Sequence, residues 1–214
     1  MIKAMIIKEL RDCQRIALVA LAAYLFITVR LIDEDWSRGG WSPVPFVMDN
    51  FLSWFVTISL AFAIALGLGQ TLGESVAGTY PLLLHRAATR RWLFGMKLLV
   101  GVTLYLVCAA VPILLYACWA ATPGTHASPF FWSMTVTTWK IWLAMPLIYL
   151  GAFLSGVRPG RWWLSRLWPL AGLSLVVVLA VGTWAWPLVG PPLLAIAALL
   201  SIMSILLVVH TRDF

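Results

Sequence analysis

The residues of this chain that could carry chemistry are few and scattered. The candidates for metal ligation, redox chemistry or nucleophilic attack are the histidines and cysteines His85, His126, His210, Cys13, Cys108 and Cys118. No cysteine has a CxxC partner, and no HExxH or GxSxG motif occurs, so the spacings of common metal, disulfide and hydrolase sites are absent. The sequence therefore predicts no catalytic residue, no metal site and no cofactor in this chain.

A glycine-rich stretch, GLGQTLGES at residues 67–75, is the part of the chain most similar to a nucleotide-binding loop. A P-loop needs the order GxxxxGK[ST], because its lysine and hydroxyl group contact the phosphates and their metal ion. This stretch has neither that lysine nor that spacing. We therefore expect that the chain is not an enzyme and does not hydrolyse ATP itself.

Charged residues inside apolar runs are a second place to look for chemistry, because a charge within a membrane is costly and marks function. Buried charge is expected to be nearly absent here, and Lys140, in the run TVTTWK, is the only candidate. Two interpretations stay open: its ammonium lines a pathway near the outer leaflet, or its long side chain extends outward to the headgroups. A carrier driven by an ion gradient needs buried ionisable groups. We therefore expect any energy for transport to come from a separate protein.

The elements that must position these residues are apolar enough to lie in lipid. The chain has 214 residues, of which 62% are hydrophobic and 11% charged, against roughly 25% charged in an ordinary soluble domain. Six apolar runs have about the length that a helix needs to span a bilayer: 16–32, 51–72, 92–119, 132–155, 167–184 and 192–209. We therefore predict an all-α fold, an integral membrane bundle of six transmembrane helices.

Basic residues are divided unevenly between the connections. Apart from Lys140, 12 lysines and arginines fall in the N-terminal segment, the second-to-third and fourth-to-fifth connections and the tail, and 2 fall in the opposite connections. Positively charged connections stay in the cytoplasm. We therefore expect both termini to be cytoplasmic, with the chain in the cell (plasma or inner) membrane. Its net charge of +7 is expected to meet membrane lipid rather than nucleic acid.

Residues 1–15 are expected to form a separate amphipathic helix on the membrane surface. One face of its helical wheel is apolar and the other polar: Ile2, Met5, Ile6, Leu10 and Cys13 against Lys8, Arg11, Asp12 and Arg15. Glu9 falls within the apolar arc, where a carboxylate needs a partner. It either pairs with a basic group of a neighbouring helix or subunit, or stays exposed on a tilted or frayed helix. Lys8, Glu9 and Arg11 are the candidate site residues of this helix.

The longest cytoplasmic connection, residues 73–97, has features of a docking segment. Pro81 suits the first turn of a short helix, and Leu82, Leu83 and Leu84 would make that helix apolar enough to dock against another protein. The alternative is an ordinary loop that rests on the membrane. The coupling segment is placed at residues 73–91, within a transmembrane domain of residues 16–214.

The order of these features resembles the permease subunits of ABC-2 type (type V) ABC transporters. Those permeases begin with a surface helix rich in Lys, Glu and Arg, similar to IIKELRD at residues 6–12. After the second span they carry a Glu, a Gly-Thr pair, leucines, and basic residues before a Lys in the third span. This chain has them in the same order: Glu74, Gly78, Thr79, Leu82, Leu83, Leu84, Arg90, Arg91 and Lys97.

The resemblance implies an exporter in which a second permease copy, identical or related, completes the pathway and cytoplasmic ABC ATPase subunits bind the inner face. By position, the ATPase-coupling residues are Glu74, Gly78, Thr79, Leu82, Leu83, Leu84, His85 and Arg86. Small residues such as Gly67, Gly69, Gly151 and Gly156 would allow close packing against the second copy. The alternatives are a membrane scaffold or assembly protein that transports nothing and, less favoured, a stand-alone carrier. An intramembrane enzyme ranks last.

Overall fold

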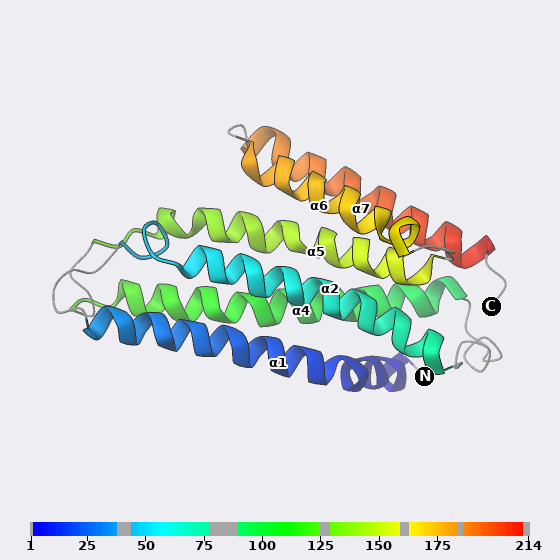
Figure 1. Cartoon of the computed structure of the whole chain (residues 1–214), viewed down its shortest axis with the longest axis horizontal. Helices are drawn as coiled ribbons and strands as arrows, with labels where there is room; N and C mark the ends of the chain where they lie inside the picture. The colour runs from blue at the N-terminus through cyan, green and yellow to red at the C-terminus, as the bar shows by residue number, and fades with distance from the viewer. Residues whose placement is uncertain are drawn as a thin grey trace.

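The computed structural model describes residues 2–37, 44–77, 90–124, 129–158, 163–183 and 186–211. These residues form long α-helices and one short 3-10 helix: α1 (Ile2–Ser37), α2 (Phe51–Ala77), α4 (Arg90–Ala121), η1 (Trp132–Thr135), α5 (Val136–Val157), α6 (Trp163–Gly182) and α7 (Trp186–Thr211). The long helices lie side by side along the long axis of the molecule (Figure 1).

Six stretches of these helices are long and apolar enough to cross a membrane: Met5–Asp33, Phe51–Leu72, Trp92–Ala121, Trp132–Val157, Ser165–Gly182 and Trp186–Val209. This confirms the predicted all-α bundle of six spanning helices. The described residues contain no strand.

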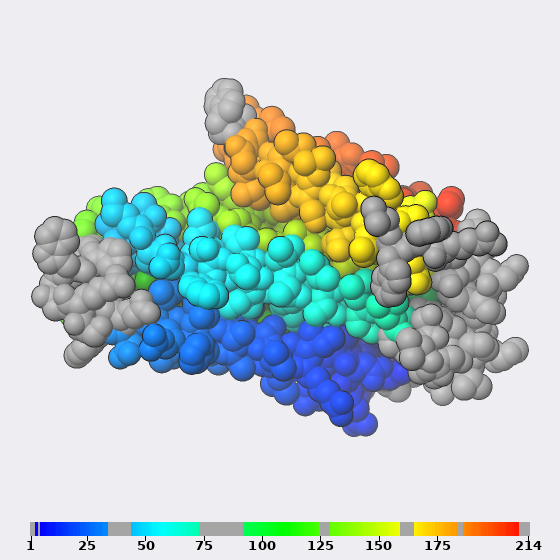
Figure 2. Space-filling model, in the orientation of Figure 1, coloured from blue at the N-terminus to red at the C-terminus, as the bar shows by residue number. Residues whose placement is uncertain are grey.

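Helix α5 lies at the centre of the bundle. It packs against α2, α4, α6 and α7, whereas α1 packs against α2 and α4. Figure 1 shows α1, α2 and α4 on one side of α5, and α6 and α7 on the other. The most apolar window of the α5 span is 78% buried, against 11% for the α6 span. In Figure 2, α1, α2 and α6 cover most of one face of the molecule, and α5 shows between α2 and α6 and beyond one end of α6.

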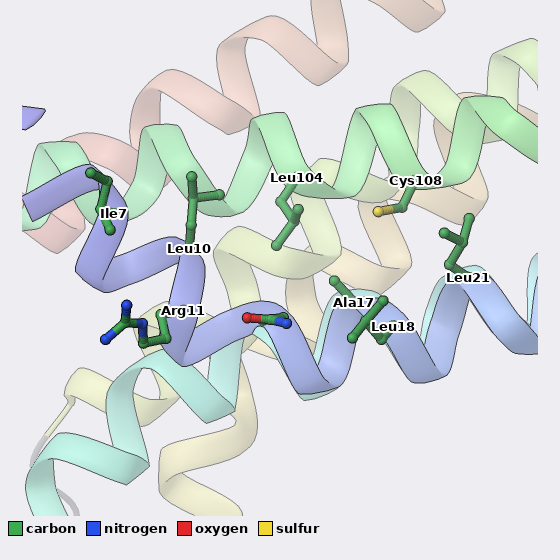
Figure 3. A pocket seen from close by; sticks show the side chains of 9 residues that line it. Ile7, Leu10, Arg11, Ala17, Leu18, Leu21, Leu104 and Cys108 are labelled. Atoms are coloured by element: carbon green, nitrogen blue, oxygen red, sulfur yellow. The ribbon is translucent and has the colours of Figure 1, made fainter.

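Helix α1 differs from the expected boundaries. It continues through Arg15 and Ile16 as one helix of 36 residues, which at about 1.5 Å per residue exceeds the roughly 30 Å of a hydrocarbon core. The surface helix expected at residues 1–15 and the first span are therefore continuous. The ribbon of α1 changes direction near Leu10 and Arg11 (Figure 3), and the position of its first part relative to the membrane surface stays a prediction.

Small residues bring α2 and α5 close together. A Cβ atom on Gly67 would lie 2.7 Å from the carbonyl oxygen of Tyr149, and one on Gly156 would collide with the side chain of Thr71. A Cβ on Gly151 would lie 3.1 Å from the Cα of Leu170 in α6. The glycines expected to face a second copy are thus used, at Gly67, Gly151 and Gly156, for packing within the chain.

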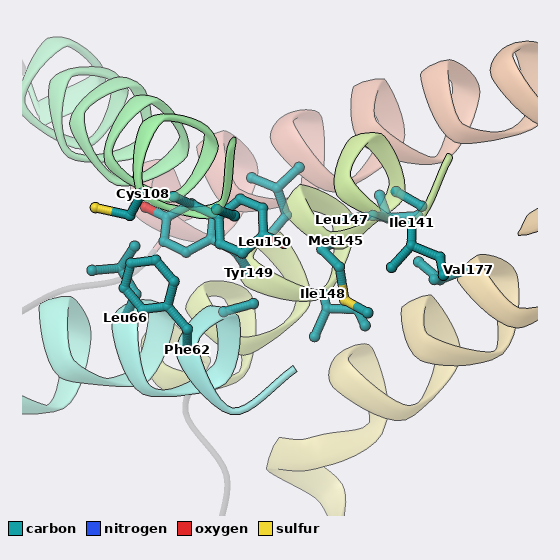
Figure 4. Close-up of a cluster of buried hydrophobic side chains, with 14 of the residues drawn as sticks. Phe62, Leu66, Cys108, Ile141, Met145, Leu147, Ile148, Tyr149, Leu150 and Val177 are labelled. Carbon is teal, nitrogen blue, oxygen red and sulfur yellow. The ribbon is translucent and has the colours of Figure 1, made fainter. Parts of the chain in front are cut away.

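The apolar core runs along this α2–α5 contact. Phe62 and Leu66 of α2 lie beside Tyr149 of α5 (Figure 4), and all three side chains are buried. On another side of α5, the preceding residue Ile148 faces α6, where Val177 is also buried. The core therefore joins the two sides of the bundle through α5.

At the end of the bundle where α2 begins, the carboxylate of Asp49 organises a short turn. It accepts hydrogen bonds from the backbone N–H groups of Phe46 (3.1 Å) and Phe51 (3.3 Å) and from the hydroxyl of Tyr116 in α4 (2.6 Å). The ring of Phe51 stacks on that of Tyr116, with centroids 4.7 Å apart. Burial raises the pKa of Asp49 above its ordinary value, while its hydrogen bond from Tyr116 acts in the opposite direction.

Candidate functional site

A cluster of buried polar side chains joins four helices near the end of the bundle where α1 begins. We call it the inner polar network and define it as Glu9 of α1, Gln70 of α2, Lys97 of α4 and Tyr149 of α5. Glu9 is 4% exposed, Gln70 and Lys97 are 5% exposed, and Tyr149 is fully buried. Each polar atom in such a place requires a partner.

The strongest contact in the inner polar network is an ion pair. The ammonium of Lys97 donates to both carboxylate oxygens of Glu9, at 2.9 Å and 3.0 Å. The ammonium of Lys8, whose side chain is 44% exposed, lies 3.7 Å from the same carboxylate. Because both members of the Glu9–Lys97 pair are buried, removing either one would leave an uncompensated charge inside the protein.

Neutral hydrogen bonds connect this ion pair to α2 and α5. The hydroxyl of Tyr149 donates to the side-chain oxygen of Gln70 at 2.6 Å, and the amide nitrogen of Gln70 donates to the carbonyl of Lys97 at 3.3 Å. A Cβ on Gly101, one turn after Lys97, would collide with the Tyr149 hydroxyl and lie 2.8 Å from the Gln70 oxygen. Glycine at this position therefore leaves room for the network.

The expectation that buried charge is nearly absent, with Lys140 as the only candidate, was wrong. Glu9 and Lys97 are both buried inside the bundle. The error followed from placing Glu9 on a separate surface helix, whereas α1 continues and packs against α4. The partner expected for Glu9 from a neighbouring helix is Lys97, so the alternative of an exposed Glu9 does not hold.

Gln70 and Tyr149 were missed at the sequence level. The available signal for Gln70 was an amide side chain within the apolar run 51–72, since a polar group there has to find a partner inside the protein. Tyr149 gave a weaker signal, because tyrosines also serve as ordinary core residues.

Lys140 lies away from the inner polar network. Its ammonium is 5.5 Å from the centroid of the Trp186 ring, at the beginning of α7. A cation over an indole face is an attractive contact, and Lys140 itself is half-buried. The position thus combines an aromatic contact with partial exposure, and a role for Lys140 in a pathway stays a prediction.

The expected ATPase-coupling residues fall mostly outside the described part of the chain. Glu74 belongs to the backbone of α2, but its side chain is outside the described residues, as are all of Gly78, Thr79, Leu82, Leu83, Leu84, His85 and Arg86. Of the other surface-helix residues, Lys8 and Arg11 are exposed. Lys8 also lies 3.8 Å from Asp12.

The residues first considered for chemistry do not assemble into a site in the described chain. The side chains of His85, His126 and His210 are outside the described residues. The thiols of Cys13 and Cys108 are free and buried, and that of Cys118 is free and exposed. Among the residues that the structure describes, no group of three metal-ligating side chains occurs.

The chain was compared with protein-family models, with curated proteins and with solved structures, and nothing matches in any of the three comparisons.

Proposed function

We propose that this chain is the membrane-spanning permease subunit of an ATP-driven ABC exporter. Two copies, or this chain and a related one, would form the translocation pathway. Separate cytoplasmic ATPase subunits would bind the connection between α2 and α4. The proposal rests on the resemblance of the sequence to ABC-2 permeases and on the position of the inner polar network.

The observation that carries the proposal is that the inner polar network lies where the α2–α4 connection leaves the bundle. Gln70 is about two helical turns before residue 78, and Lys97 is about two turns after residue 89. The side chain of Gln70 and the backbone of Lys97 are hydrogen-bonded to each other. A protein that moved residues 78–89 would therefore act on two helices that are already joined.

The Glu9–Lys97 pair extends this connection to α1. A buried, bidentate ion pair resists separation, because either partner alone would carry an uncompensated charge. Movement of the first turns of α4 would consequently displace the first turns of α1 as well. A buried ion pair that joins two helices in this way suits a subunit that transmits motion from a cytoplasmic ATPase, whereas a static scaffold does not require it.

Affinity purification of the tagged chain from its own cells in mild detergent tests the proposal. We expect a stoichiometric P-loop ATPase among the partners. A variant with Leu82, Leu83 and Leu84 all changed to Asp should lose that ATPase. The matched control places Asp at Val47 and Met48, which are apolar and exposed at the opposite end of α2, and should retain it. Recovery of the chain without an ATPase in several detergents would contradict the proposal.

A second candidate, a stand-alone carrier, gains support from one observation. Glu9 is a buried carboxylate inside the bundle, and such groups serve ion-coupled carriers. Proton uptake that accompanies transport by the purified chain alone in vesicles, and that is lost in Glu9→Gln, would favour this candidate over the ABC permease.

A further inference from the structure

An open groove runs between α1 and α4 on the outside of the bundle. Its volume is about 460 Å³, within the roughly 300–1,000 Å³ typical of small-molecule sites. Apart from Arg11 and Gln14 the lining is apolar, and it consists of Ile7, Leu10, Ala17, Leu18, Leu21, Leu104 and Cys108 (Figure 3). Because α1 belongs to a spanning segment, a groove on this outer face opens towards lipid.

The shape of the groove follows from the course of α1. Ile7 and Leu10 come before the change in direction of the ribbon, and Ala17, Leu18 and Leu21 come after it (Figure 3). Ala17 is small, and Leu104 of α4 lies across from it. The result is an apolar groove beside α4, with a lining that suits a hydrocarbon chain.

Arg11 and Gln14 contribute hydrogen-bond donors to the lining of this groove, between its apolar residues before and after the change in direction of α1. Both side chains are exposed, and Arg11 forms no ion pair with any residue that the structure describes. The adjacent carboxylate of Asp12 lies 3.8 Å from Lys8 instead. A guanidinium presents several donors in a planar fork that matches a phosphate group.

We propose that the groove binds one anionic phospholipid. Its phosphate accepts hydrogen bonds from Arg11 and Gln14, and an acyl chain lies along Leu10, Leu18 and Leu104. An acyl chain gains little by leaving other lipid for an apolar groove, so selectivity comes from the charged headgroup. This inference does not depend on the function proposed above.

Native mass spectrometry of the purified full chain tests the proposal. The protein is exchanged into equal amounts of phosphatidylglycerol and phosphatidylcholine with identical acyl chains, and the retained lipid is identified. We expect one phosphatidylglycerol per chain. Arg11→Gln should lower the preference for the anionic lipid about fivefold, the factor corresponding to about 1 kcal/mol for one basic group near an anionic surface. Arg15→Gln, a matched change at an exposed residue that does not line the groove, should keep the preference.

A second variant tests the apolar part of the site. Ala17→Trp fills the groove and should reduce retention of both lipids, while the helical content measured by circular dichroism stays unchanged. Equal retention of the two lipids by the unmodified chain would overturn the proposal. So would equal losses in Arg11→Gln and Arg15→Gln. If Ala17→Trp instead dissociates a dimer without changing lipid retention, a second copy covers the groove and the proposal fails.

Discussion

The Glu9–Lys97 pair predicts a strong energetic coupling between α1 and α4. The perturbation is a double-mutant cycle with Glu9→Gln, Lys97→Met and the two combined. Both residues are 5% exposed or less, and the ammonium lies within 3.0 Å of each carboxylate oxygen. Removing one member of such a pair costs about 3–5 kcal/mol, whereas apolar or neutral groups in both places are often tolerated.

The two single variants should lower the free energy of unfolding by different amounts. Glu9→Gln leaves the Lys97 ammonium without its carboxylate and is expected to cost about 3–5 kcal/mol. Lys97→Met leaves the Glu9 carboxylate with Lys8 still 3.7 Å away, so its cost is expected near the lower end of that range. The double variant should be more stable than either single variant. Lys8→Met, at an exposed residue, should cost at most about 1 kcal/mol.

Reversible unfolding in mixed micelles measures these free energies. The sodium dodecyl sulfate fraction is raised while tryptophan fluorescence is followed, and the 13 tryptophans of the chain provide the signal. Coupled residues deviate from additivity, whereas independent ones add to within about 0.5 kcal/mol. Additive effects of the two single variants would refute the conclusion that the buried pair is a single unit.

Three further predictions use the same unfolding measurement. Gly67→Ala should cost about 1–3 kcal/mol, because its Cβ would lie 2.7 Å from a backbone oxygen of α5, whereas Gly172→Ala, with nothing within 4 Å, should cost almost nothing; equal costs would contradict the close packing of α2 on α5. The pKa of Asp49 is raised by burial above its ordinary value of 3.8. The stability contributed by the protonated carboxyl group is therefore fully present below pH 3.8 and is lost as the pH rises through the raised pKa. Asp49→Asn should therefore abolish this part of the pH dependence, and an unchanged pH profile would argue against the burial of Asp49. Lys140→Gln should cost about 0.5–2 kcal/mol of stability through the lost contact with Trp186. In a chain that already carries Trp186→Leu, the same substitution should cause no measurable loss of stability.

Hydropathy predicts the number and type of the helices because each span must be long enough and apolar enough to cross the same hydrocarbon core. It does not predict how the spans are arranged, because all six are apolar. A partial signal was present: the α5 span has the lowest mean hydropathy of the six and is the most buried. A helix surrounded by other helices tolerates glycine and polar groups that a helix facing lipid does not.

The candidate site was only partly predictable. The place of Glu9 in an apolar arc showed that its carboxylate needs a partner, but no local pattern identifies Lys97, which is 88 residues away in the sequence. The continuity of α1 was also missed, since a surface helix and a spanning helix share the same local backbone. Lys140 beside Trp186 is another pairing that depends on the arrangement of helices in space.

ATP hydrolysis by the complex that purifies with the chain is the most direct test of its proposed role as a permease. The ATPase is assayed in lipid nanodiscs with the unmodified chain, with the variant carrying Asp at Leu82, Leu83 and Leu84, and without the chain. The permease proposal predicts that hydrolysis depends on the unmodified chain and falls to the chain-free rate with the variant. A hydrolysis rate that is the same in all three preparations would contradict it.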